Sequence, residues 1–450
     1  IWGSNFTSNI ILGKPMKTSL YFKQLSISTT FFLALCLVTI AEAQVIEEVI
    51  VSAEKRDESL QDISQAVSAL TDSDLENKNI ESLVDLSAIV PGVTVSKNEG
   101  YKTVISIRGV GNETNQNAIA APSVAFHIDG VFIASPFSLL TDFIDIERIE
   151  VLRGPQGTLF GQNSTGGAIN VISKKPTTDD YYGKADLTIG NYDLLKYRTS
   201  VNIPVSEKVA TRFSFSSTKR DGFSENIVTG QDLDDANNIS LRSDWAIEIS
   251  DSSSLRIFAQ YFDIDRNGAA MRGIDDQTSG IRNLAQDTIS NQELTSKVFA
   301  AIYEQDLGYA NLKIVASSQE DDINVTRDND RHNLGETVAA IPGLEGTTYI
   351  KAEFRPETSL VETKTLEVNL ISNDPILNGK LDWVAGAFYM DHKIENHIKG
   401  YRDWDANGEI KYVCDESFAN PDYCYTHNYN FPAALDVFSA GEFDFVTDAY

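Results

Sequence analysis

The feature that most constrains this chain is an alternation of apolar and polar residues that begins after Pro176. Between residues 184 and 189, Ala185, Leu187 and Ile189 alternate with polar side chains. The same alternation occurs in segments 212–216, 255–261, 312–316, 365–370 and 381–389. A period of two residues is typical of a β-strand whose two faces meet different surroundings. Repeated segments of about ten residues with this pattern predict an antiparallel transmembrane β-barrel, wet inside and apolar outside.

Long polar stretches separate the alternating segments, and we expect them to be loops. They are residues 225–238, 263–293, 322–358 and 392–431. Loops of this length are unusual in compact domains but routine on the outer side of membrane barrels. A soluble β-sandwich or β-helix would alternate too, so that alternative stays open on the pattern alone. About ten strand candidates follow residue 183, whereas the larger single-chain membrane barrels have about 22 strands. We therefore expect the chain to hold only the first part of a barrel.

The residues before Pro176 follow a different pattern, in which short strands alternate with helical periodicity. Apolar residues at helical spacing are Ile80, Leu83, Val84, Leu86 and Ile89, and Pro91-Gly92 predicts the end of that helix. Asp129-Gly130 lies between two apolar runs and is a strong β-hairpin signal. Strands are expected at residues 103–107, 124–128, 131–133, 147–152 and 168–172. Residues 55–176 are therefore predicted to form a compact α+β domain.

The first 43 residues have the pattern of an export signal. Met16, Lys17 and Lys23 form a basic region, and an apolar run of residues 31–41 ends at a small-x-small cleavage site, Ala41-Glu42-Ala43. The run is too short for a permanent transmembrane helix, which needs about 20 residues. We predict a signal peptide that starts at Met16, preceded by upstream translated residues.

The charge balance excludes one class of partner. The chain has 37 basic and 65 acidic residues and a formal net charge of -28. Nucleic-acid binding needs a basic face, so DNA and RNA are not expected partners.

A polar stretch near the C-terminus suggests two further features. Cys414 and Cys424 are ten positions apart, and in an exported protein such a pair predicts a disulfide. Asp403, Asp405 and Asn407, followed by a glycine, match oxygen-ligand positions of a calcium loop, but the position of the bidentate glutamate holds Cys414. An ordinary acidic turn is the favoured reading, and apart from this structural calcium no cofactor is expected.

Four motifs carry a family resemblance. Residues 148–176, RIEVLRGPQGTLFGQNSTGGAINVISKKP, closely resemble the plug-domain signature of TonB-dependent receptors. Residues 48–53 resemble the TonB box, and Arg108-Gly109 and Asp129-Gly130 fall where the family carries its RG and DGV elements. The signature residues are Gly109, Asp129, Gly130, Gly154, Pro155, Gly157, Gly161, Gly166 and Gly167. The resemblance covers the chain from about residue 47 to its end.

The resemblance implies a domain order and a set of contacts. Residues 44–54 would be the TonB-box segment, residues 55–176 the plug, and residues 177–450 the first part of the barrel. The box comprises Glu48, Val49, Ile50, Val51, Ser52 and Ala53. A short β-prone run of this kind can be captured by a partner's sheet edge, here that of the TonB energy-coupling protein in the periplasm. By the same resemblance, Arg108 and Arg153 would pair with acidic side chains of the barrel wall.

The implied function is active uptake through the outer membrane of a Gram-negative bacterium. A ferric siderophore is the first expectation for the cargo, and an oligosaccharide is the alternative within the family. A surface adhesin or structural β-protein is the alternative from another class, but no regular repeat period supports it. No Ser-His-Asp arrangement or paired-carboxylate motif stands out, so an enzyme is not expected.

Overall fold

The computed structural model describes most of the chain after the leader region, and the account below concerns those residues. They run from 50 to 445, with gaps at 53–54, 57, 62, 64, 99, 112–121, 141, 274–275, 329–330, 332, 334–336, 339–348, 351, 376–380, 399–400 and 404–440. Within these ranges, no helix is both long enough and apolar enough to cross a bilayer. The predicted signal peptide, the disulfide and most of the calcium loop lie outside the described residues.

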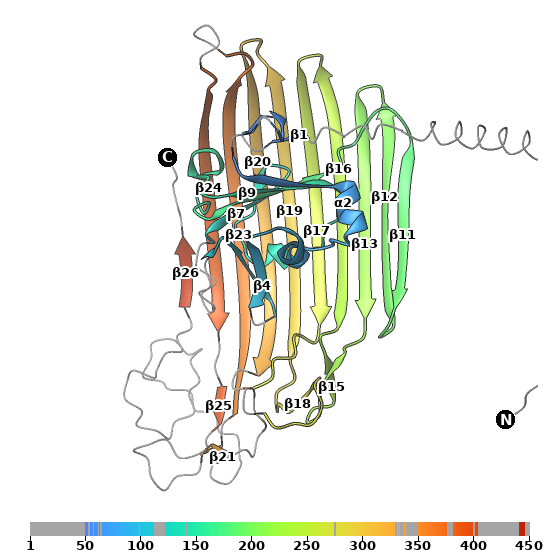
Figure 1. The fold of residues 1–450 in the computed structure, drawn as a ribbon, viewed down its shortest axis with the longest axis vertical. Coiled ribbons are helices and arrows are strands. Elements are labelled where there is room, and N and C mark those ends of the chain that lie inside the picture. The colour runs from blue at the N-terminus through green and yellow to red at the C-terminus, as the bar shows by residue number, and fades with distance from the viewer. Residues whose placement is uncertain are drawn as a thin grey trace, which may run out of the picture. The chain divides into compact units, whose positions relative to one another are not determined.

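The plug contains two small sheets and short helices (Figure 1). Its main sheet has the order β3-β9-β10-β7-β8, with bounds Val67–Thr71, Ile146–Arg153, Gly167–Ser173, Val124–Ile128 and Val131–Phe132. Its second sheet is β4-β5-β6, with bounds Val93–Asn98, Lys102–Ile107 and Val110–Gly111. The helical elements are α2 (Asp72–Asn77), η1 (Leu83–Asp85), α3 (Leu86–Ile89), η2 (Ser138–Leu140) and α4 (Gly157–Phe160).

Local sequence signals explain several of these elements. The Asp129-Gly130 hairpin is confirmed: β7 pairs with β8, and the turn residues have φ values of 52° and 82°. Positive φ at both central positions is what a two-residue hairpin turn requires. The helix predicted over residues 80–89 is wrong in extent, because it is a 3-10 turn followed by the four-residue α3. Helix α2 was not predicted, although Thr71 begins it with a capping box to Asp74.

The rest of the described chain forms one large antiparallel sheet. Its path is β11-β12-β13-β16-β17-β19-β20-β23-β24-β26, with β25 beside β23. The strand bounds are Tyr182–Gly190, Leu194–Ser206, Val209–Arg220, Ala236–Ser250, Ser253–Arg266, Asn291–Asp306, Ala310–Asp328, Ala352–Ser372, Val384–Ile398 and Gly441–Phe445, and β25 is Tyr401–Asp403. Among the described strands, β11 and β26 are the two ends of this path, so the barrel is not closed.

Several strands are longer than the sequence pattern predicted. Strand β20 has 19 residues and β23 has 21, so the expected loop over residues 322–358 is wrong at both ends. At about 3.3 Å per residue, β20 is about 60 Å long, whereas the hydrocarbon core of a bilayer is about 30 Å thick. The strands therefore continue beyond the membrane on the side of the long loops. There β14 (Ser224–Asn226), β15 (Gln231–Leu233) and β18 (Asn283–Leu284) build a small sheet, and β21 (Thr337–Val338) pairs with β22 (Tyr349–Ile350).

The large sheet exposes its apolar side chains and buries its polar ones, which is the opposite of the arrangement in a soluble protein. Apolar side chains stand exposed on one face, as shown by Phe213 at 40% exposure and Leu241 at 45%. Their neighbours Arg212, Arg242 and Asp244 point to the other face and are buried, at 5% exposure or less. A soluble core would place the apolar set inside. The expected barrel wall, apolar outside and polar inside, is therefore confirmed, and we call these the outer and lumenal faces.

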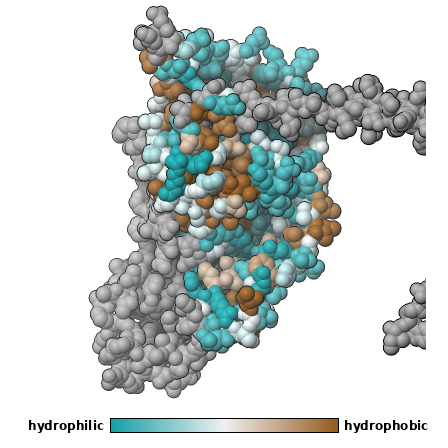
Figure 2. All heavy atoms as spheres, in the orientation of Figure 1, coloured by the Kyte–Doolittle hydropathy of each residue, from teal (hydrophilic) through white to brown (hydrophobic). Residues whose placement is uncertain are grey.

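The plug packs directly on the lumenal face. Its core residues, among them Ile107, Val124 and Ile149, belong to one cluster with Phe258 of β17, Val298 of β19 and further wall residues. In the view of Figure 2, apolar residues gather over the plug and hydrophilic residues lie around them. The wall residues that the plug core touches are thus apolar.

Candidate functional site

The described part of the box segment is held on the plug. Ile50 and Val51 form β1, which pairs antiparallel with β2 (Glu58–Ser59). Val51 is fully buried. The Ser52 N–H donates to Glu150 Oε1 at 2.9 Å, and the Ser52 hydroxyl donates to the same oxygen at 3.2 Å. Glu48, Val49 and Ala53 of the predicted box lie outside the described residues.

Glu150 is a buried carboxylate that gathers several donors around the box. It is 0% exposed on β9 and accepts from Arg148 Nε at 2.9 Å and from Asn170 Nδ2 at 3.2 Å. Arg148 supplies the positive charge that a buried carboxylate needs. The box segment therefore docks on a carboxylate that the plug sheet already positions.

The residues after the box reach the barrel wall. Lys55 Nζ lies 2.8 Å from Glu367 Oε1 on β23, and Arg56 Nη1 lies 2.9 Å from Asp382 Oδ1. Arg56 also donates to the Ser372 hydroxyl at 2.6 Å. Ser372 ends β23 and pairs with Ala310, just after the short turn 307–309, so this anchorage lies at the end of the sheet with the short turns.

Asp129, in the hairpin turn of the plug, makes the most buried charged contact with the wall. Its carboxylate accepts from Arg242 Nη2 at 2.6 Å and from Arg256 Nη1 at 3.1 Å, and also from the Ser173 N–H at 2.9 Å. Asp244 of β16 binds the same two arginines, at 3.0 and 2.6 Å. Two wall arginines are thus shared between one plug carboxylate and one wall carboxylate.

The electrostatics of Asp129 follow from this arrangement. Burial alone would raise the pKa of its carboxyl group, but Arg256 and Arg242 outweigh burial and lower the pKa to about 2. The side chain is therefore ionised at any physiological pH. A fully ionised carboxylate between two guanidinium groups binds the plug strongly to β16 and β17.

Further polar contacts tie other parts of the plug to the wall. Asp145 accepts from Arg212 Nη2 at 2.7 Å, and Ser138 donates to Asp321 at 2.6 Å. At the β4–β5 hairpin, Glu357 of β23 is paired with Lys102 at 3.0 Å and also bound by Tyr101. These carboxylates and cations come from strands distant in sequence, so no local motif could have indicated the pairs.

The expected contacts of Arg108 and Arg153 are not found on the described strands. Arg108 is exposed in a turn with φ 53°, and its N–H donates to the Gly92 carbonyl at 2.7 Å. Arg153 Nη2 donates to Ser68 within the plug at 2.7 Å. Within the described residues neither guanidinium pairs with a wall carboxylate. Both polarities occur between plug and wall: at Asp129 and Asp145 the arginines belong to the wall, whereas Lys55 and Lys102 are plug cations on wall carboxylates.

The signature glycines have unequal structural roles. Gly167 has φ 149°, and a Cβ there would lie 2.2 Å from the Leu152 carbonyl oxygen, so only glycine fits where β10 passes β9. A Cβ on Gly157, by contrast, would meet no atom within 4 Å. No cluster of three or more metal-binding side chains occurs within the described ranges. Of the predicted calcium loop, only the backbone of Asp403, in β25, is described.

A small α+β domain is bound by ion pairs to the lumenal face of a sheet whose outer face is apolar. This arrangement is typical of a plugged membrane β-barrel. Comparisons with known proteins lead to the same class. Residues 59–168 match the family model of the TonB-dependent receptor plug domain. Residues 59–168 are thus a TonB-dependent receptor plug domain, as the sequence motifs indicated, and the expected outer-membrane location is that of the relatives.

Two relatives and two solved structures illustrate the similarity. The vitamin B12 transporter BtuB of Vibrio vulnificus is 28% identical over 189 residues, which are 42% of this chain and 30% of that protein. The iron-regulated outer membrane virulence protein of Vibrio cholerae is 34% identical over 134 residues, 29% of this chain and 20% of that protein. These alignments therefore span less than a third of either relative.

The solved structures extend the similarity to the barrel. The ferric yersiniabactin uptake receptor FyuA from Yersinia pestis superposes with a TM-score of 0.63 at 16% identity, covering 76% of this chain and 50% of that one. The pyoverdine outer membrane receptor FpvA from Pseudomonas aeruginosa gives 0.62 at 17% identity, covering 78% and 49%. At these identities the likeness shows the fold, an α+β plug with an antiparallel barrel sheet.

Proposed function

We propose that the protein is a TonB-dependent outer-membrane receptor that takes up a scarce solute actively, with a ferric siderophore as its cargo. The observation that carries this proposal is the box segment, a two-residue strand that the plug holds at the short-turn end of the sheet. In outer-membrane barrels short turns face the periplasm and long loops face outward. The segment therefore lies where a periplasmic energy-coupling protein could reach it.

The way the box is held suits capture by a partner. Strand β1 pairs with β2 over only two residues, so a partner's sheet edge has few hydrogen bonds to replace. The stronger obstacle is the Ser52–Glu150 contact, since hydrogen bonds to a charged group contribute about 1.5–3 kcal/mol each. Cargo binding on the loop side would act by weakening this contact. Force on the freed segment would then move or remodel the plug.

The names of relatives support iron as the cargo. Besides the iron-regulated protein of Vibrio cholerae, the ferripyoverdine receptor of Pseudomonas aeruginosa is 29% identical over 143 residues. The vitamin B12 transporter matches a larger share of the chain, 42%, so cobalamin is included in the test. The proposed activity is binding and transport of the solute without making or breaking covalent bonds, so no residue is assigned a catalytic role.

Uptake by cells that carry the full-length receptor tests the proposal. Residues 48–53 are replaced by a glycine-serine segment of equal length, and uptake of ⁵⁵Fe-labelled ferric hydroxamate and catecholate siderophores, labelled cobalamin and a labelled oligosaccharide is followed. We expect energised uptake of an iron complex to fall at least tenfold, while binding of the same complex to the cells is retained. Unchanged uptake would refute coupling through the box, and uptake of cobalamin or oligosaccharide alone would refute the iron assignment.

A further inference from the structure

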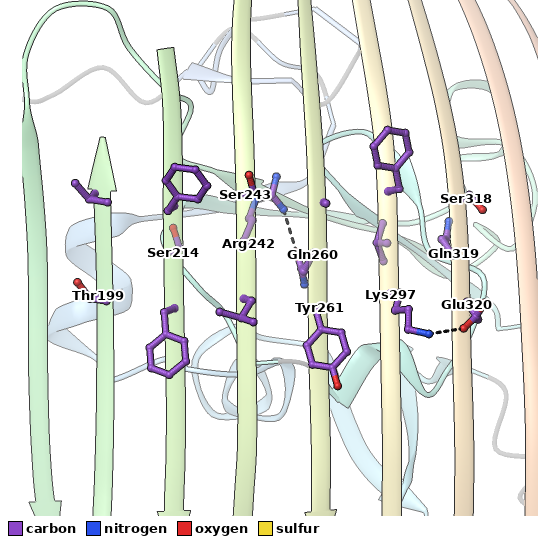
Figure 3. A pocket seen from close by; sticks show the side chains of 17 residues that line it. Thr199, Ser214, Arg242, Ser243, Gln260, Tyr261, Lys297, Ser318, Gln319 and Glu320 are labelled. Atoms are coloured by element: carbon purple, nitrogen blue, oxygen red, sulfur yellow. Dashed lines mark hydrogen bonds and ion pairs between the residues drawn. The ribbon is translucent and has the colours of Figure 1, made fainter. Parts of the chain in front are cut away.

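One carboxylate of the wall takes its counter-charge from the segment that follows the box. Lys55 Nζ lies 2.8 Å from Glu367 Oε1 on the lumenal face of β23, and the two side chains are only 15% and 13% exposed. Asn369, which is neutral, also donates to Glu367, at 2.6 Å. By contrast, Glu320 on the outer face is paired with Lys297 of the neighbouring wall strand (Figure 3). Movement of the box segment therefore leaves Glu320 paired, but it removes the one cation that binds Glu367 within the described residues.

A buried histidine of the plug lies beside this ion pair. His127 on β7 is 2% exposed, and its Nδ1 has no hydrogen-bond partner among the described residues. Its ring packs on those of Phe132 and Phe160, at 5.5 and 5.3 Å between centroids. Lys55 Nζ lies 5.1 Å from the centre of the Phe160 ring, on the far side of which the pair with Glu367 begins. Lys55 and Glu367 are also the two charged groups that act on the imidazole.

The other elements around His127 supply no unpaired charge. Strand β8 and helix α4 contain no charged residue. Within the plug sheet, His127 is the cross-strand partner of Asn170, which is neutral. The remaining charged side chains of the sheet and the box segment pair elsewhere: Glu150 with Arg148, and Arg56 with Asp382. The imidazole therefore responds to Lys55 and Glu367.

The docked box segment keeps His127 neutral. The two rings that contact His127 belong to the same apolar cluster as Val51 of β1, so the segment helps to bury them. Burial lowers the pKa of His127 to about 3 from 6.5, and Lys55 adds to the decrease, whereas Glu367 opposes it. Release of the segment would remove part of the burial and all of the lysine charge, while Glu367 stays on the wall. A buried carboxylate that loses its base is very costly unless another cation replaces it.

We propose that His127 takes up a proton when the box segment is released and replaces Lys55 as the counter-charge of Glu367. As a partner draws the segment away, Ser52 separates first, and Lys55 then leaves Glu367. A proton from water binds the free Nδ1 of His127, and the resulting imidazolium balances the carboxylate. When the segment docks again, the N–H bond breaks and the proton returns to water. The inference rests on the proposed function, because release of the box gives this exchange its role.

Acid should favour release of the segment. The released state binds the proton at a higher pH than the docked state, so the contribution of His127 to docking is fully present above about pH 6.5 and is lost as the pH falls toward 3. Within that interval the ratio of released to docked segment should rise about tenfold per pH unit. From pH 7 to pH 5 the expected rise is about 20-fold, since part of this range lies above 6.5.

Nuclear magnetic resonance of the histidine rings in the full protein tests the electrostatic part. We expect wild-type His127 to stay neutral down to pH 5. Lys55→Gln removes the lysine charge and leaves Glu367 without a base, so His127 should bind its proton about one pH unit higher or more. Lys78→Gln, an exposed lysine of the plug that pairs with Asp74, is the matched control. Protonation of wild-type His127 at pH 7, or the same titration in all three proteins, would overturn the proposal.

Hydrogen exchange of the Lys55 amide tests the link to release, because this N–H donates to the Ser52 carbonyl at 3.1 Å in the docked segment. The exchange rate in the wild type is divided by that in His127→Phe at each pH, which cancels the pH dependence of chemical exchange. We expect the ratio to rise about 20-fold from pH 7 to pH 5, and a constant ratio would show that the proton and release are independent. Both measurements use the purified protein without partner or cargo, so a failure of coupled uptake is distinguishable from a failure of this inference.

Discussion

Two attachments differ in chemistry: that of the plug to the barrel wall at Asp129, and that of the predicted box segment to the plug at Ser52. At Asp129, one buried carboxylate binds two wall arginines, and the pKa of that carboxyl group is lowered to about 2. At Ser52, a half-buried serine and its N–H bind Glu150, beside a strand pair of two residues. The first attachment resists separation because a charge left alone in a buried site is very costly. The second leaves no charge unpaired when it opens, because Glu150 keeps Arg148 and Asn170. The difference separates the part of the plug that stays fixed from the segment that can be released.

The largest expected effect is loss of the Asp129 attachment. In Asp129→Ala, Arg242 and Arg256 retain only Asp244 as counter-charge, and breaking a buried pair in this way costs about 3–5 kcal/mol. Hydrogen exchange of the β7 and β10 amides in the full protein should accelerate by the factor that corresponds to this loss of free energy. Exchange of the amides in the wall strands should stay unchanged. Asp251→Ala, in an exposed turn, is the control. If both variants exchange alike, Asp129 is not the main anchor.

A pH titration sharpens the comparison, because the plug also contains a buried histidine. His127 lies on β7 between Phe132 and Phe160, and burial, with help from Lys55, lowers its pKa to about 3 from 6.5. On acidification, the His127 ring is therefore protonated at a lower pH in the folded state than in the unfolded state. Its contribution to the free energy of unfolding is fully present above pH 6.5 and is lost as the pH falls toward 3. Between pH 7 and pH 5 this amounts to about 2 kcal/mol for a single such group.

A pH titration distinguishes His127 from Asp129, because the two side chains titrate in different pH ranges. Asp129 keeps its charge until the pH falls below its ordinary value of 3.8, so its ion pairs persist at pH 5. His127→Phe keeps an aromatic ring between the same neighbours and cannot titrate. We expect plug stability in this variant, measured by urea unfolding of the full protein, to lose its dependence on pH between 7 and 5. An equal fall in both proteins would assign the acid sensitivity to other groups.

The sequence predicted the fold more completely than it predicted the contacts between plug and wall. Alternation identified the barrel strands, since the two faces of each strand meet different media, and the Asp129-Gly130 pair located the hairpin because few residues accept positive φ. Strand ends were missed, because beyond the bilayer the outward side chains are polar, such as Glu293 and Asp322, while the apolar ones, such as Leu294 and Ile323, face inward. A strand without an apolar outer face lacks the pattern of a membrane strand. Asp129 was singled out as a signature residue, but its arginine partners lie 113 and 127 positions along the chain. Pairs at such separations are set by tertiary packing, which no local pattern encodes.

The smallest effect is expected at the box. Ser52→Ala removes the hydroxyl bonds to Glu150 but keeps the N–H bond. Docking should therefore weaken by about 1.5 kcal/mol, the low end for a hydrogen bond to a charged group. That corresponds to about a tenfold rise in the open population, seen as about tenfold faster hydrogen exchange of the residue 52 amide. The amides of β7 should not change, because Asp129 remains bound. Ser59→Ala, in the paired strand β2, controls for loss of a serine. If the change spread to β7, the two attachments would be one cooperative unit, and release of the box would require release of the whole plug.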